Sequence, residues 1–230
     1  MLEKLLILFF AGGFVGLDTT AAWQVLLAHP LISSTVLGWI FGNIPFGMLF
    51  GVLMELIWLK DVPVGGAKFP EGNLGSLAGL GSILWIDAPG AMGRPWLLLW
   101  GILYAFFVAQ LIGFTIVLMR RNNEILARWA DRFAEKNSPS GVAWMHRLGI
   151  FHAFFHGALW TALAVSVGAL FLPKLTQLGE SWFPLTLGSV KFAFLGLGIG
   201  AVGFLVTSQK NRFYLVLGIL AGILLSLLAG

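Results

Sequence analysis

The sequence predicts an all-α membrane protein, a polytopic helical bundle in which some helices are broken or re-entrant. Of its 230 residues, 58% are hydrophobic and 10% are charged, and the mean hydropathy is +0.91. A soluble domain has about a quarter of its residues charged, so this composition fits a chain dissolved in a bilayer. About seven apolar blocks can be drawn, several of them about 20 residues or longer, and their residues do not alternate as barrel strands do.

Charge, cysteine content and the first residues exclude several other classes of protein. The net charge is +4, but the basic residues lie in short loops beside apolar blocks, so we expect no nucleic-acid partner. The chain has no cysteine and therefore neither disulfides nor thiolate metal sites. The first residues resemble a signal peptide, but no small-residue cleavage site followed by a soluble domain comes after them. We therefore expect a retained first helix. We interpret residues 1–230 as a single membrane domain.

The first membrane segment is expected at residues 5–28, and it contains a carboxylate. Asp18 would cost at least about 2.5–3.5 kcal/mol facing lipid, so it should face protein or a cavity. In one interpretation Asp18 sits near a helix break and caps the following turn with Thr19 and Thr20. In the other it belongs to the substrate site, and the sequence leaves both open.

Residues 30–86 are expected to be a broken-helix region that holds the substrate site. Two short helices are predicted at 31–43 and 44–59, with Asn43 before Ile44 and Pro45 as a good start for the second. The pair is either a hairpin that dips into the membrane or one kinked crossing. Residues 64–86 follow as a polar loop and a half-length helix, whose Gly72, Gly75, Gly79 and Gly81 predict close packing. Short apolar segments broken by Gly or Pro are typical of transporter substrate sites.

The second half of the chain predicts more regular elements. Residues 96–119 form a full span that ends at Arg120 and Arg121, and amphipathic residues 123–136 lie either on the membrane surface or in a packed loop helix. Basic residues make 121–147 a cytoplasmic loop, and the N-terminus also falls inside. The remaining elements are a span at 148–172, an external loop at 174–182, and spans at 183–207 and 213–228.

Glu55 is the only charged residue in the apolar run 31–59. A carboxylate among such neighbours must be protonated, paired or facing a polar ligand. Lys60 and Lys68 are the candidate partners. A simple Glu55–Lys60 pair at the membrane edge is the alternative, although a residue five positions along a helix is not on the same face.

The glycine-rich loop after this run is the second candidate. Lys68 and Glu71 flank Phe69 and Pro70, and the proline holds the backbone away from regular helix, which exposes N–H and C=O groups. Carboxylates, an asparagine amide and bare backbone are groups that a polyol ligand can use. The alternative is an ordinary extracytoplasmic loop.

Residues 30–71 contain a series of short elements in a specific order and spacing. They are PLI at 30–32, LG at 37–38, GN at 42–43, FGMLFGVLMELIWL at 46–59, GGA at 65–67 and PE at 70–71. In these elements the chain resembles the membrane IIC subunit of the mannose/fructose/sorbose family of bacterial phosphotransferase systems, and the resemblance is dense over about fifty residues.

The resemblance implies an elevator-type sugar permease of the bacterial cytoplasmic (inner) membrane, multi-pass, that pairs with a second membrane subunit, IID. Soluble IIA and IIB phosphocarrier proteins would bring phosphate from phosphoenolpyruvate to the incoming hexose-type sugar. This chain would then be a transport subunit and not an enzyme, without a cofactor, and we expect an oligomer. The family's acids fall on Glu55 and Glu71, and no catalytic or metal-binding residue is predicted. The predicted substrate-binding residues are Glu55, Glu71, Gly65, Gly66, Lys68, Asn73 and Asp18.

Departures from the family pattern motivate an alternative function. Asn43 stands where an Asp is usual, Pro63 where a sugar-contacting asparagine is usual, and Lys68 adds a charge to the loop. These changes suggest a degenerate, non-transporting membrane scaffold or sensor of the same fold. A third hypothesis is a metalloenzyme that uses His152 and His156, which are four residues apart as in zinc proteases. The accompanying Glu and a third ligand are missing, so we expect these histidines to have a helix-packing or interfacial role.

Overall fold

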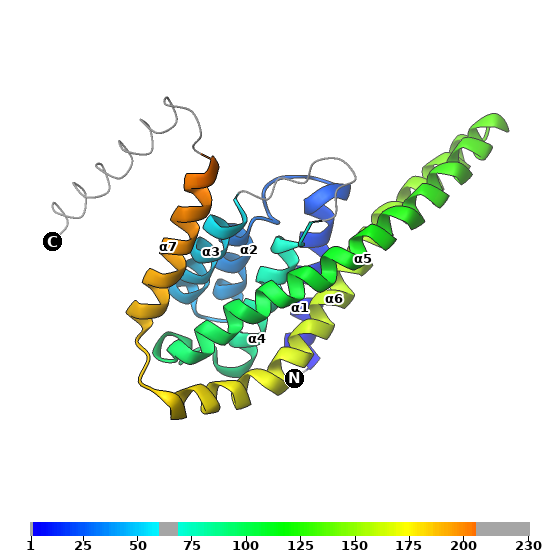
Figure 1. Ribbon diagram of the computed structural model, residues 1–230. Helices are drawn as coiled ribbons and strands as arrows, with labels where there is room; N and C mark the ends of the chain where they lie inside the picture. The colour runs from blue at the N-terminus through cyan, green and yellow to red at the C-terminus, as the bar shows by residue number, and fades with distance from the viewer. Residues whose placement is uncertain (1, 60–68, 206–230) are drawn as a thin grey trace.

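The computed structural model describes residues 2–59 and 69–205, and within them every regular element is a helix (Figure 1). The prediction of an all-α membrane protein is confirmed, and in this part of the chain α5 and α6 are long and apolar enough to cross a membrane. The predicted residues Lys60, Pro63, Gly65, Gly66 and Lys68 and the predicted span at 213–228 lie outside the described residues. The elements are α1 (Leu2–Gly16), the π-helical turn η1 (Leu17–Ala21), α2 (Pro30–Ile40), α3 (Ile44–Trp58), α4 (Gly72–Asp87), the 3-10 turn η2 (Ala91–Gly93), α5 (Pro95–Glu135), α6 (Pro139–Trp182) and α7 (Leu187–Leu205).

The first segment is shorter than predicted. Regular helix ends at Gly16, η1 follows, and residues 22–29 are not helical, so the span expected at 5–28 is wrong in its second half. Trp23, Gln24 and Leu26 have φ angles of 67°, 52° and 69°, in the left-handed region that a continuing α-helix cannot contain. Hydrogen bonds from this segment to Asp18 stabilise it outside the helix.

α2 and α3 form a hairpin rather than one kinked crossing. The two helices lie side by side in Figure 1, and glycines allow their backbones to touch. A Cβ on Gly38 would lie 2.9 Å from the Cα of Gly47, and a Cβ on Gly51 would lie 2.8 Å from the carbonyl oxygen of Pro30. The chain reverses at Gly42, whose φ of 77° suits a residue without a side chain.

Asn43 starts the second helix of the hairpin, as predicted. Its Oδ1 accepts from the N–H of Phe46 at 3.1 Å, and its Nδ2 donates to the carbonyl oxygen of Ala88 at 2.6 Å. The side chain therefore caps α3 and also ties the hairpin to the end of α4.

Replacing Asn43 by alanine is expected to lower the free energy of unfolding by about 1–3 kcal/mol, because both the cap and the bond to Ala88 are lost. Asn43→Asp keeps the acceptor for Phe46 and loses the donor, so its effect should be smaller. Thermal unfolding of the detergent-solubilised protein measures both variants. An Asn43→Ala melting temperature equal to that of the wild type would show that these bonds contribute nothing.

α4 is the helix around which the others pack. Residues 74–84 are all buried, so α4 contacts protein on every side. A Cβ on Gly75 would lie 2.7 Å from the carbonyl oxygen of Ala105, and one on Gly79 would lie 2.8 Å from that of Gly101, both in α5. The close packing predicted for the glycines of this helix is confirmed, because Gly72 and Gly81 also have side-chain atoms where a Cβ would stand.

α5 and α6 are longer than predicted and pack against each other. α5 has 41 residues and continues through Arg120 and Arg121 to Glu135. The amphipathic stretch predicted at 123–136 is therefore the outer end of α5 with the residue after it, and neither a surface helix nor a separate loop helix. Residues 121–147, predicted as a cytoplasmic loop, are the ends of both helices and a short turn. At 1.5 Å per residue, α5 is about 60 Å long, about twice the thickness of the hydrocarbon core. The pair projects from the body of the molecule (Figure 1).

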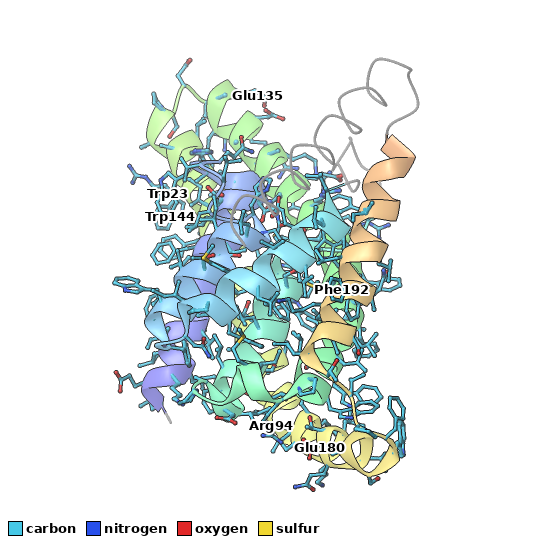
Figure 2. The ribbon with its side chains drawn as sticks, turned by 90° about the vertical axis from the view of Figure 1, so that its left-hand side faces the viewer. Trp23, Arg94, Glu135, Trp144, Glu180 and Phe192 are labelled. Atoms are coloured by element: carbon cyan, nitrogen blue, oxygen red, sulfur yellow. The ribbon has the colours of Figure 1, made fainter. Side chains whose placement is uncertain are left out.

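The external loop predicted at 174–182 is also helical. Pro173 lies inside α6, which has 44 residues and ends at Trp182. A proline removes one backbone hydrogen bond and bends a helix, and neighbouring turns here continue past it. Figure 2 shows Arg94 and Glu180 at the end opposite Glu135, and Arg94 joins Glu180 and Asp87 through nitrogen–oxygen distances of 3.8 Å.

Candidate functional site

The break after α1, the start of α2, the second half of α3 and the first turn of α4 line a cavity of about 350 Å³, which we call the polar cavity. Three predicted site residues from distant parts of the chain meet there: Asp18, Glu55 and Asn73. A site formed by broken helices and carboxylates is what the sequence predicted for this region. The other lining residues are Thr19, Gln24, Leu26, Ala28, His29, Pro30, Trp58 and Leu59.

Asp18 holds the segment that follows the break. Its side chain is 4% exposed, Oδ1 accepts from the N–H of Val25 at 2.7 Å, and Oδ2 accepts from the N–H of Ala28 at 2.8 Å. Thr19 does not take part in this cap, because its hydroxyl donates to the carbonyl oxygen of Val15 at 2.9 Å. The capping interpretation therefore describes the hydrogen bonds of Asp18, and the same carboxylate also lines the polar cavity.

Glu55 pairs with His29, a residue that the sequence interpretation missed. The His29 Nδ1 lies 2.7 Å from Glu55 Oε1, and the N–H of Leu31 donates to Oε2 at 3.2 Å. The carboxylate thus lies at the N-terminus of α2, where free N–H groups favour negative charge. In a hairpin that packs Gly51 against Pro30, Glu55 lies beside His29. The pair could therefore have been predicted only from the register of the hairpin.

Glu71 lies in a separate, smaller cavity of about 60 Å³. Its side chain is 2% exposed, and its Oε2 has no hydrogen-bond partner among the described residues. Its N–H donates to the carbonyl oxygen of Ala109 at 2.9 Å, which anchors the segment to α5. A buried carboxylate oxygen without a donor is unfavourable, so this position suits a hydroxyl or another donor. The two cavities share Thr19, Trp58 and Asn73 in their walls.

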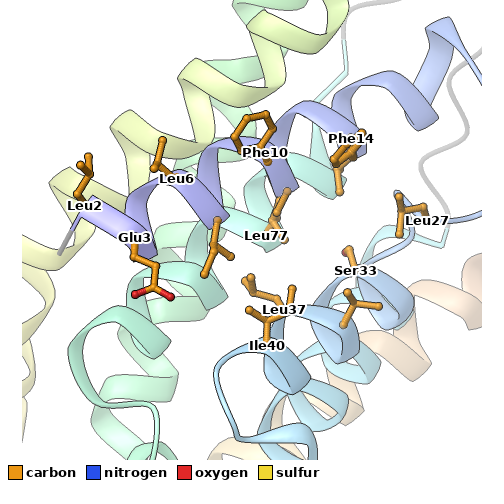
Figure 3. Close-up of a pocket in the computed structure, with 14 residues that line it drawn as sticks. Leu2, Glu3, Leu6, Phe10, Phe14, Leu27, Ser33, Leu37, Ile40 and Leu77 are labelled. Carbon is orange, nitrogen blue, oxygen red and sulfur yellow. The ribbon is translucent and has the colours of Figure 1, made fainter.

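A larger cavity of about 650 Å³ has a different chemical character. It lies between α1 and α2 and is lined by apolar side chains such as Phe10, Leu37 and Ile40, with Glu3 at one end (Figure 3). Of its lining residues, only Glu3 and Ser33 carry polar side chains. It does not offer the several converging hydrogen-bonding groups that a polyol needs, so we place the candidate site in the polar cavity.

His152 and His156 connect α6 to α5. His156 Nε2 lies 2.9 Å from the hydroxyl oxygen of Thr115, and His152 Nδ1 lies 3.1 Å from Oδ1 of Asn123. Both contacts join the two long helices, in agreement with the helix-packing role expected from the sequence.

Comparison with known proteins identifies a family model that matches nearly the whole chain and relatives that match about three fifths of it. The family model of the PTS system sorbose-specific IIC component matches residues 1–229. The chain is 29% identical over 144 residues to the sorbose-specific EIIC component of Lacticaseibacillus casei, which covers 63% of this chain and 48% of that protein. It is 26% identical over 141 residues to the mannose-specific EIIC component of Escherichia coli (strain K12), covering 61% and 50%. The matches thus span about half the length of these relatives.

Two solved structures have a similar fold. One is described as a membrane protein and gives a TM-score of 0.72 at 17% identity. The other, a cryo-EM structure of the mannose transporter ManYZ in complex with microcin E492, gives 0.61 at 19% identity. Each similarity covers 97% of this chain and 87% of the other, and at these identities it shows the fold alone.

Proposed function

Because the chain belongs to the family of sorbose-specific IIC components of sugar phosphotransferase systems, we propose that it is a sugar-translocating permease subunit. It binds a hexose-type sugar in the polar cavity and passes it inward for phosphorylation by a soluble IIB partner. The observation that carries the proposal is the meeting of Asp18, Glu55 and Asn73, from three separate segments, around one cavity at a helix break. IIC components are membrane transport subunits, so phosphoryl transfer takes place on the other proteins of the system.

The same proposal includes the partners and the location of the protein. The chain is a multi-pass protein of the bacterial inner membrane that assembles with a IID membrane subunit and receives IIA and IIB from the cytoplasm. The similarity to the fold of the mannose transporter ManYZ supports a membrane complex of this kind. Alternating access follows from motion of the lobe that carries the α2–α3 hairpin, since the site lies at the edge of that hairpin.

The chemistry of the polar cavity supports a polyol ligand. Glu55 has a carboxylate oxygen beside His29 and another near the start of α2, and both can accept from vicinal hydroxyls. Asn73 adds an amide that donates and accepts. Hydrogen bonds to charged groups contribute about 1.5–3 kcal/mol each, so one such pair of bonds is enough to orient a sugar.

Replacing Glu55 by glutamine is expected to weaken sugar binding by about 10–100-fold, because a neutral amide oxygen accepts weaker hydrogen bonds from the sugar and from His29 than a carboxylate does. The measurement is equilibrium binding of labelled hexoses, hexosamines and sorbose to membranes that contain this chain and its IID partner. Glu3→Gln is the matched control, because Glu3 is exposed and lies outside the polar cavity.

Each result of this experiment has a defined meaning. Saturable binding of one sugar, lost in Glu55→Gln and kept in Glu3→Gln, supports the permease and identifies its substrate. Normal binding by Glu55→Gln removes Glu55 from the site. If a folded and assembled wild-type complex binds none of the sugars, the proposed function fails and the non-transporting scaffold takes its place.

A further inference from the structure

Trp58 lines both the polar cavity and the cavity of Glu71. It is the last residue of α3, three positions after Glu55, and residues with that spacing lie on the same side of a helix. Its side chain is half-buried and contributes to the lining of both cavities. A ligand bound to Glu55 in the polar cavity therefore has Trp58 among its neighbouring residues.

The position of this ring is set by contacts on several sides. Its Nε1–H donates to the hydroxyl oxygen of Ser76 at 3.1 Å, and that hydroxyl donates to the carbonyl oxygen of Gly72 at 2.6 Å. The ring of Phe106 packs against it with centroids 5.1 Å apart and an angle of 53°. Ring atoms of Trp58 occupy the space in which a Cβ on Gly72 would stand, so a larger residue at position 72 would overlap the indole.

These contacts determine what Trp58 offers to a ligand. The indole has a single hydrogen-bond donor, and Ser76 occupies it. The ring atoms left to line the cavities are therefore carbon surface. The other groups of the polar cavity include the carboxylates of Asp18 and Glu55, the imidazole of His29 and the amide of Asn73. The cavity thus combines an aromatic wall with hydrogen-bonding groups.

A pyranose sugar has the same two kinds of surface, since hydroxyl groups project around its ring and C–H groups form an apolar face. We propose that Trp58 is the aromatic wall against which the apolar face of the bound sugar packs, and that it is a specificity-determining residue. This inference rests on the proposed function and adds to it the part of the sugar that is recognised. A hydroxyl whose configuration interrupts the apolar face would point at carbon and lose its hydrogen bonds, so such a sugar is disfavoured.

Trp58 also contacts the cavity of Glu71. Both cavities have Trp58 in their walls, together with Thr19 and Asn73. A smaller side chain at this position would enlarge both cavities and remove the aromatic surface beside Glu55. We therefore expect loss of the indole to lower affinity and also to weaken the discrimination between sugars that differ at one hydroxyl.

The test is equilibrium binding of a panel of hexoses that differ in the configuration of one ring hydroxyl, measured on the complex with the IID partner. Trp58→Leu should bind the preferred sugar about tenfold more weakly or worse, and its affinity ratio between epimers should approach one. Trp58→Phe keeps an aromatic face and should retain most of both. Ser76→Ala removes the acceptor that fixes the ring and should lie between them. Trp39→Leu is the matched control, because Trp39 is 68% exposed and lines neither cavity.

The outcomes separate this inference from the proposed function. If the wild type binds sugar and Trp58→Leu melts normally with unchanged affinity and epimer ratio, Trp58 is not the wall of the site while the permease stands. If Trp58→Leu does not fold, Ser76→Ala decides, and a wild-type affinity and epimer ratio in that variant would overturn the inference. If the wild type binds no sugar, the proposed function fails and the inference fails with it.

Discussion

Replacing Gly157 by valine is expected to separate α6 from α1 and to leave little correctly folded protein. A Cβ on Gly157 would overlap the carbonyl oxygen of Gly12 and lie 3.0 Å from the Cα of Gly16. These are backbone atoms of α1, so no side-chain movement relieves the overlap and the helices must move apart. Gly12 and Gly16 have the four-residue spacing of small residues that lets membrane helices approach closely, and the contact is lost along this whole face.

Size-exclusion chromatography of the detergent-extracted protein measures this effect as the fraction in a monodisperse peak. Gly149→Val is the matched control in the same helix, because nothing lies within 4 Å of a Cβ at Gly149. We expect a normal peak for the control and at most a small one for Gly157→Val. Equal peaks for the two variants would show that α1 and α6 do not approach through these glycines.

Replacing Asp18 by alanine is expected to destabilise the protein and to remove sugar binding together. The N–H groups of Val25 and Ala28 lose their acceptor, and an unsatisfied buried donor costs about 1–3 kcal/mol. The segment from 22 to 29 also places His29 beside Glu55. When this segment loses its hydrogen bonds to Asp18, the polar cavity is disturbed as well. Two losses of this size are a large part of the stability of a single domain.

Thermal unfolding and sugar binding of the same preparations measure the two effects of Asp18→Ala. Asp131→Ala is the control, since Asp131 is an exposed acid on the outer end of α5. Asp18→Asn keeps one acceptor oxygen and should lie between the alanine variant and the wild type in both measurements. A normal melting temperature with lost binding would mean that Asp18 acts on the ligand and not on the backbone, and the reverse result would leave it as a cap alone.

The sequence predicted local features better than long-range ones. The start of α3 was predictable because Asn43 and Pro45 act within one helical turn. The end of helix after Gly16 was not, because it depends on bonds between Asp18 and N–H groups seven and ten residues away. The length of α5 was missed for another reason. Arg120 and Arg121 resemble the end of a membrane span, yet charged residues do not interrupt a helix that continues beyond the bilayer.

The candidate site shows the same limit. Glu55 stood out because it is a lone charge in an apolar run, and its pairing with His29 needed the register of the α2–α3 hairpin. Trp58 belongs to an ordinary apolar pattern, and only the position of Ser76, eighteen residues away, shows that its donor is occupied. A polar residue in a membrane segment is conspicuous in a sequence, whereas an aromatic wall is visible only in three dimensions.

α5 is one uninterrupted helix through Arg120, so a rotation at its inner end displaces its outer end. Its outer turns cannot tilt independently of the inner ones, and its packing along α6 stiffens it further. For a rod about 60 Å long, a rotation of about 10° about the inner end carries the tip through about 10 Å. Small angular changes where α4 rests on Ala105 and Gly101 are therefore magnified at the turn between α5 and α6. A spectroscopic label at that turn would move farther than a label anywhere near the cavity.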